Sequence, residues 1–392
     1  MLFRSAVPLV GWGGGTWGGG TWGNGSTTYS EMRLWNQMNY GEDLVFGPRG
    51  GGLYYWDATG GVTTRGVLLS SLGGTATITI ASPAVVTSTV LYTEGAAIKF
   101  STTGALPTGI TAGTTYYVYN VDGLTFQLLD AAGAVVNTSG SQSGTQSITA
   151  VDVPLYQNNL TVSDTSRFII VFGTNDYGSS TLDPMLIRWS NQDDPYNWTP
   201  DATNQAGSSR LSHGSQIVTT VQTRQEIFVL TDSSAYSLQY LGPPYVWQPQ
   251  LLGDNISIIS PNAAVIASGV VYWMGVDKFY AYDGRVQTLN CDLRRHVFSD
   301  INRQQQYQVF CGTNEGFNEV WWFYCSANST TIDKYVVYNY LEKVWYYGTM
   351  ARTAWLDSGL RDYPVAATYS YNLVNHEQGL NDNETEIGRA HV

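Results

Sequence analysis

The feature that most constrains this 392-residue chain is a pair of short apolar strands that recurs along it. In each pair, two runs rich in Val, Ile, Phe, Tyr and Trp flank a turn of Gly, Asn, Asp or Ser, which is typical of an antiparallel hairpin. We expect the first strands at 43–47, 167–173, 226–232, 270–275, 319–325 and 364–370. The second strands are expected at 53–57, 185–190, 235–240, 278–283, 334–339 and 372–377.

The spacing of these pairs indicates the fold. Corresponding positions are Trp56, Trp189, Tyr240, Tyr282, Tyr338 and His376, at intervals of 133, 51, 42, 56 and 38 residues. Removing the Thr-, Gly-, Val- and Ala-rich block 68–152 brings the first interval into line with the others. A period of about 40 to 55 residues with four short strands is the signature of a β-propeller blade. We therefore predict an all-β chain with five or six propeller-like blades, one inserted small all-β module and one short rim helix.

The sequence predicts the following division. Residues 36–67 form the first blade segment, 68–152 the inserted module and 153–380 the other blades, and 6–35 are a Gly- and Trp-rich arm. Gly-rich sequence does not order itself, so the arm either lays its Trp rings on another surface or is a disordered linker. Residues 1–5 and 386–392 look like translated sequencing adapters, so we expect the native protein to be longer. The rim helix is expected at 292–303, with Leu293, Val297, Phe298 and Ile301 on one face.

Charge and composition exclude several classes of function. The formal charge is −12 and only four Lys are present, which argues against a surface that binds duplex DNA. No apolar run is long enough for a membrane span. Three Cys, an odd number, do not form a disulfide framework and suggest a reduced compartment during folding. Cys311 and Cys325 are expected on adjacent strands, where a small buried hydrophobe is the commoner role of a Cys.

Residue types that carry chemistry are sparse. His213, His296 and His376 are far apart, so a His-built metal site is not expected. Asp193-Asp194 is the best acidic pair for a glycosidase, but we favour an Asx-type turn there, with Trp198 as a core anchor. Asp277 and Asp283 are interpreted as turn residues for the same reason. We predict no catalytic, cofactor-binding or metal-binding residues and no enzymatic activity.

A dense aromatic set is the remaining candidate for function. It consists of Trp273, Trp321, Trp322, Tyr324, Trp345, Tyr346, Tyr347 and Trp355. Strand alternation points half of such residues inward, and the outward half suits a subunit interface better than a sugar platform. The predicted interface residues are Trp12, Trp17, Trp22, Trp322, Trp345 and Tyr347.

Several segments together resemble the tail nozzle (tail tubular) proteins of short-tailed bacteriophages. They are GWGGGTWGGGTWG (11–23), RLWNQMNYGEDLVFGPRGGGLYYWDA (33–58), RWSNQDDPYNWTP (188–200), LLGDNISIISPNA (251–263), GVDKFYAYDGRVQTL (275–289), GTNEGFNEVWWFY (312–324) and YNYLEKVWYYGTMARTAWLDSGLRDYP (338–364). Block 75–148 resembles a small all-β module inserted in many phage virion proteins.

The resemblance implies a structural virion subunit, assembled in the bacterial cytoplasm, in a homo-oligomeric ring of six copies. The ring would lie below the portal and adaptor, neighbour the tail fibres, and complete a channel through which genome DNA passes without specific binding. A head-to-tail stabilising or plug protein is the related alternative. A propeller glycoside hydrolase and a carbohydrate-binding receptor module are alternatives of other classes.

Overall fold

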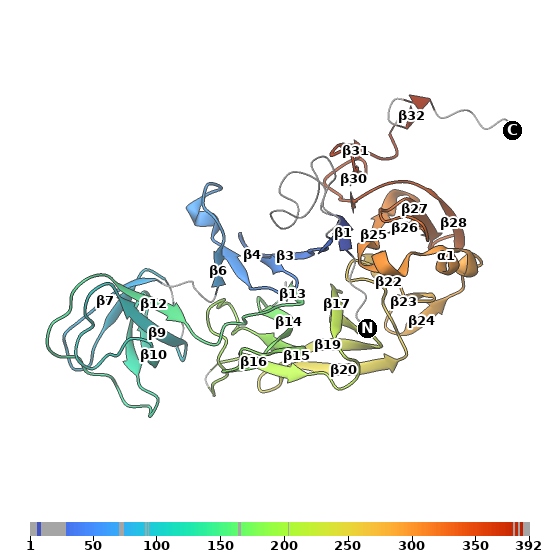
Figure 1. Cartoon of the computed structure of the whole chain (residues 1–392). Helices are drawn as coiled ribbons and strands as arrows, with labels where there is room; N and C mark the ends of the chain where they lie inside the picture. Colours follow the sequence, from blue (N-terminus) through green and yellow to red (C-terminus); the bar gives the residue numbers. More distant parts are fainter. Residues whose placement is uncertain are drawn as a thin grey trace. The chain divides into compact units, whose positions relative to one another are not determined.

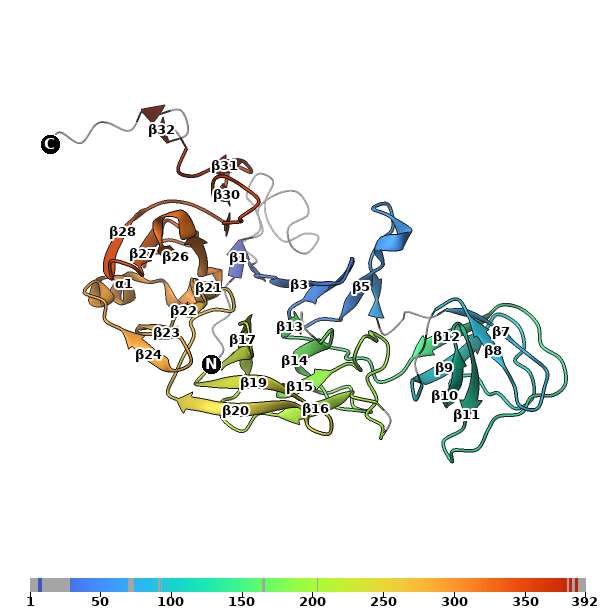
Figure 2. The same cartoon turned by 180° about the vertical axis from the view of Figure 1, so that it is seen from behind.

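The computed structural model describes residues 6–8, 29–69, 74–90, 92, 94–163, 166–202, 204–378, 381–382 and 385–386. The chain divides into two compact units, one of Arg33–Asn255 and one of Ile256–Val392 with Met1–Met32. Figures 1 and 2 show small antiparallel sheets that follow one another along the chain in both units. Six of these sheets are propeller blades, which confirms the predicted fold class.

Three blades belong to the unit Arg33–Asn255. The first blade comprises β3 (Trp35–Tyr40), β4 (Asp43–Pro48), β5 (Tyr54–Trp56) and β6 (Val67–Leu68). The second comprises β13 (Asn159–Val162), β14 (Ile169–Asn175), β15 (Leu182–Trp189) and β16 (Gly207–Arg210). The third comprises β17 (Ile217–Gln222), β18 (Ile227–Thr231), β19 (Ser234–Gly242) and β20 (Val246–Asp254).

The other three blades belong to the unit that contains Ile256–Val392. The fourth blade comprises β21 (Ala264–Ala267), β22 (Val270–Met274), β23 (Phe279–Tyr282) and β24 (Val286–Leu289). The fifth comprises β25 (Phe310–Asn314), β26 (Glu319–Tyr324), β27 (Lys334–Asn339) and β28 (Val344–Thr349). The sixth has three strands, β29 (Ala354–Leu356), β30 (Val365–Ala367) and β31 (Leu373–Asn375).

Each predicted strand pair forms the middle of one of these sheets or, in the sixth, its last two strands. All residues of β14, β18, β23 and β26 are buried. Residues of β16 alternate between half-buried and exposed, and most residues of β28 are exposed. A strand that is covered on both faces needs a continuous apolar run, as in RFIIVFG and EVWWFY. The first strands of successive blades contact one another in each unit, β3 with β13 and β13 with β17, and β21 with β25 and β25 with β29.

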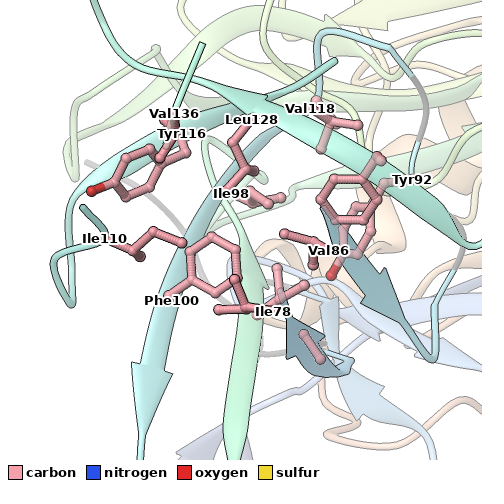
Figure 3. Close-up of a cluster of buried hydrophobic side chains, with 14 residues drawn as sticks. Ile78, Val86, Tyr92, Ile98, Phe100, Ile110, Tyr116, Val118, Leu128 and Val136 are labelled. Carbon is pink, nitrogen blue, oxygen red and sulfur yellow. The ribbon is translucent and has the colours of Figure 1, made fainter. Parts of the chain in front are cut away.

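A closed barrel lies within the predicted module, between β6 and β13 in the sequence. Its strands are β7 (Thr75–Ile78), β8 (Val86–Ser88), β9 (Ala97–Thr102), β10 (Thr115–Asp122), β11 (Thr125–Leu129) and β12 (Gln146–Ala150), closed in the order β10-β11-β8-β7-β12-β9. Figure 3 shows Ile98, Phe100, Leu128 and their neighbours packed together inside it. Small barrels are filled by side chains in this way, so the module has a core of its own.

The predicted helix forms but is shorter than predicted, and of its predicted face Leu293 and Phe298 are only half-buried. Helix α1 spans Arg294–Asp300, and Val297 and Ile301 are buried. Leu293 at its N-cap makes no side-chain cap hydrogen bond, and Ile301 is already extended, so neither end continues the helix. The 3-10 helix η3 (Arg303–Gln308) follows, and two others are η1 (Ala58–Gly60) and η4 (Glu315–Phe317). Short strand pairs lie near the ends, β1 (Ala6–Pro8) with β2 (Tyr29–Glu31) and β32 (Asn381–Asp382) with β33 (Thr385–Glu386).

A buried arginine joins separate segments of the second blade. Arg188 on β15 is fully buried and donates from Nη1 to the Asn175 carbonyl oxygen at 3.1 Å. Its Nη2 donates to the carbonyl oxygens of Asp152 and Trp198. The guanidinium also lies 4.1 Å from the centre of the Tyr177 ring. Burial lowers the pKa of Arg188, and these carbonyl and ring contacts compensate the charge.

We expect Arg188→Met to lower the free energy of unfolding by about 3 kcal/mol, because it leaves buried carbonyl groups without a donor. Urea denaturation followed by tryptophan fluorescence measures this change. The matched control is Arg210→Met, which breaks an exposed ion pair to Asp183 (2.6 Å) and should cost less than about 1 kcal/mol. Equal costs for the two variants would show that Arg188 does not hold the blade together.

Candidate functional site

The six residues predicted for a subunit interface lie in different places. Trp12, Trp17 and Trp22 lie outside the described residues. Trp322 is fully buried and donates from Nε1 to the Ala263 carbonyl oxygen at 3.1 Å. It therefore has no surface to offer a partner, and the structure removes it from the predicted interface. The reason is that β26 is a middle strand covered on both faces, so strand alternation does not expose half of it.

Trp345 and Tyr347 lie on β28, which pairs only with β27 and is the outer strand of its blade. Trp345 is half-buried and Tyr347 is 52% exposed. The Tyr347 ring lies 4.5 Å from the His296 ring of α1. We call Trp345, Tyr347 and His296 the outer-strand surface. Of the eight aromatic residues in the dense set, four are buried, which are Trp273, Trp321, Trp322 and Tyr324.

A cleft of about 690 Å³ lies between the fourth and fifth blades, within one unit. We call it the inter-blade cleft. Its aromatic wall is formed by Tyr272, Tyr338, Tyr340 and Trp345. Its polar lining includes Asp283, Gln287, Asn290, Asp292 and Lys343. The volume is in the usual range of small-molecule sites, so the cleft is a candidate binding site.

The aromatic wall is held by contacts among its own rings. Tyr272 and Tyr340 are stacked with their centroids 5.9 Å apart and their planes at 20°. Tyr338 and Trp345 lie 4.6 Å apart. Burial raises the pKa of Tyr272 to about 12, with smaller contributions from Tyr338 and Tyr340, so its phenol is neutral at physiological pH.

Hydrogen bonds hold the polar side of the cleft. Gln287 Nε2 donates to both carboxylate oxygens of Asp283 at 3.0 Å. Trp345 Nε1 donates to the Asn290 carbonyl oxygen at 2.8 Å, which joins the fifth blade to the end of the fourth. The cleft was missed from sequence because its walls come from two blades, and Asp283 was interpreted only as a turn residue.

The acidic pair Asp193-Asp194 forms a turn, as predicted. Asp194 is buried and accepts from the Tyr196 backbone N–H at 2.9 Å. Asp193 forms an ion pair with Arg167 at 3.1 Å. Trp198 is fully buried and donates to the Pro195 carbonyl oxygen at 2.8 Å, so it is the core anchor expected of it.

A second pair of carboxylates was not singled out from the sequence. Asn314 Nδ2 donates to Glu319 Oε2 at 3.4 Å and to Glu377 Oε1 at 3.2 Å. Glu319 is buried, and it also accepts from Trp321 Nε1 at 2.9 Å and from the Tyr346 hydroxyl. Burial raises the pKa of Glu319, and the charge of Glu377 acts in the same direction. Because donors of the fold occupy both Glu319 oxygens, this residue acts as a structural anchor of the fifth blade.

Two of the predicted histidines have separate partners. His213 contacts Asp254 at 2.9 Å, and His376 accepts from Arg352 Nε at 3.0 Å. In the described ranges, no three His, Cys, Asp or Glu side chains are placed to hold a metal ion. No helix in the same ranges is long and apolar enough to cross a membrane.

No family model matches the chain, and no curated protein matches it. Among solved structures, Hsv2 of Kluyvelomyces marxianus is similar with a TM-score of 0.35 and 8% identity, over 71% of this chain and 75% of that one. Hsv2 of Kluyveromyces lactis has a TM-score of 0.33 and 11% identity, over 71% and 74% of the two chains. The structural class of the protein follows from its own sheets, which make it an all-β protein with six propeller blades.

We expect the three free cysteines to react slowly with Ellman's reagent in the native protein. Burial raises the pKa of Cys291 to about 11 and that of Cys325 to about 12, and it raises the pKa of Cys311. At about pH 8 the reactive thiolate is then scarce, so each thiol should react about a hundredfold more slowly than in the unfolded chain. The same titration in guanidinium is the control, and a rapid native burst equivalent to one thiol would contradict the prediction.

Proposed function

We propose that this chain is a structural subunit of a bacteriophage tail, of the nozzle or tail tubular kind. It assembles into a homo-oligomeric ring below the portal and adaptor, beside the tail fibres, and the ring completes the channel for DNA exit. The observation that carries the proposal is the set of family-like segments spread over the chain. Their strand-forming parts build blades, as in 312–324, which covers the turn and strand β26 of the fifth blade.

The surface chemistry supports this role. The net charge of −12 repels DNA phosphates, so a genome can slide through such a ring without adhering to it. Blades with fully buried middle strands are rigid, which suits a particle that has to survive outside a cell. The outer-strand surface presents Tyr347 and the half-buried Trp345, and aromatic residues are enriched where subunits meet.

The alternative within the same class is a head-to-tail stabilising or plug protein. It shares the propeller blades and the acidic charge, and it differs in whether the subunit leaves an open lumen. Images of the assembled ring distinguish the two, because a nozzle shows a continuous channel and a plug shows density across it.

We expect the purified chain to form six-membered rings, by resemblance to the family. Tyr347→Arg should lower the association constant for ring formation by tenfold or more, because it places a bulky charge in an aromatic contact. Analytical ultracentrifugation and negative-stain imaging measure this change. The control is Tyr245→Arg, which changes another exposed Tyr (70%) on a different blade and should leave the ring unchanged. A chain that stays monomeric at high concentration, with no binding to a portal–adaptor complex, would refute the tail assignment.

A further inference from the structure

We propose that the inter-blade cleft binds a neutral oligosaccharide. The inference concerns the cleft, which shares Trp345 with the outer-strand surface, and it does not rest on the tail role. It stands on the volume of the cleft, its aromatic wall and its hydrogen-bonded polar lining, all within the fourth and fifth blades.

The aromatic wall fits the apolar faces of sugar rings. The C–H groups on one face of a pyranose carry slight positive charge, and they pack on the electron-rich face of an aromatic ring. Tyr340 and Trp345 are both half-buried, so each presents part of its ring to the cleft while the rest packs on the fold. Tyr340 is held by its stack on Tyr272, and Trp345 lies 4.6 Å from the Phe279 ring. These rings are fixed before a ligand arrives, which limits the entropy lost on binding.

The polar side fits hydroxyl groups, each of which donates one hydrogen bond and accepts others. Asp283 and Asp292 supply acceptors, while Gln287 and Asn290 supply both donors and acceptors. Asp283, Asn290 and Asp292 are exposed, so they can exchange water for sugar hydroxyls at little cost. The bidentate contact of Gln287 with Asp283 keeps this carboxylate in place.

The charge of the cleft selects the kind of saccharide. Two carboxylates and one ammonium group, that of Lys343, line it. A phosphate, sulfate or uronic acid would be repelled by the carboxylates and would find only one cation. A neutral glycan meets no such penalty, and its apolar and hydroxylated faces match the aromatic and polar groups that line the cleft.

A second copy of the chain is the competing occupant. Its docking would use the outer-strand surface, where Tyr347 is 52% exposed and does not line the cleft. The lining of the cleft includes two carboxylates and one ammonium group, whereas subunit interfaces are depleted in charged residues at their centre. Tyr340 and Tyr347 therefore separate the two activities, because only Tyr340 lines the cleft.

The experiment is titration calorimetry of the full chain with maltotriose, cellotriose and chitotriose, after a screen on an array of neutral and acidic glycans. We expect at least one neutral trisaccharide to bind with a millimolar or tighter dissociation constant, and acidic glycans to bind more weakly. Tyr340→Ala should reduce the affinity about tenfold or more, and so should Asp292→Ala, which alters an exposed residue and leaves the core untouched.

The matched control is Tyr347→Ala, which removes an aromatic ring from β28 outside the cleft and should leave sugar affinity unchanged. No binding of any array glycan or trisaccharide would overturn the proposal. An equal loss of sugar affinity in Tyr340→Ala and Tyr347→Ala would also overturn it. So would a Tyr340→Ala variant that binds sugar with normal affinity but no longer self-associates. If the unmodified chain binds sugar but forms no rings, only the tail role is refuted.

Discussion

The structure depends on the burial of both faces of the middle strands in each blade. An isolated four-stranded sheet leaves both of its faces in water, whereas β14 and β26 are buried on both faces. Each blade is therefore stable only against a neighbour, which is why one hydrophobic cluster combines residues of the second and third blades and another those of the first and second. Trp355 of the sixth blade packs on the cluster of the fifth. At about 2 kcal/mol for each large buried side chain, these shared cores dominate the stability of the fold.

The same constraint explains how much of the fold could be predicted. Fully buried strands leave continuous apolar runs separated by turn residues, so all six strand pairs were visible in the sequence. The limits of helix α1 could not be predicted, because Leu293 caps it without a side-chain hydrogen bond and an extended Ile301 ends it. Arg188 was also not foreseen, since its partners are backbone carbonyl groups that leave no sequence pattern.

The candidate sites were less predictable than the fold, for a related reason. Alternation was expected to place Trp322 outward, but this rule holds only for a sheet with one wet face. On β28, an outer strand, Tyr347 is exposed as expected, but so is Tyr346 on the opposite face, so the exposure comes from the edge position of the strand and not from alternation. Tyr272 and Trp345 both line the inter-blade cleft although they are 73 positions apart in the sequence. Only the packing of two blades brings them together, so the sequence pattern does not show it.

The outer strand β28 carries residues of both the inter-blade cleft and the outer-strand surface. Side chains along a strand alternate between its two faces, so Trp345 and Tyr347 share one face, while Tyr346 turns to the other and donates to Glu319. The ring of Trp345 packs against the rings of Phe279, Trp322 and Tyr338. Only the remaining part of the Trp345 ring can contact a ligand. Tyr347 lies against the His296 ring and is 52% exposed. Trp345 belongs to both surfaces, and its ring is held in place by Phe279 of the fourth blade and by Trp322 and Tyr338 of the fifth. A contact made at Tyr347 would therefore not need to move the ring of Trp345 in the cleft.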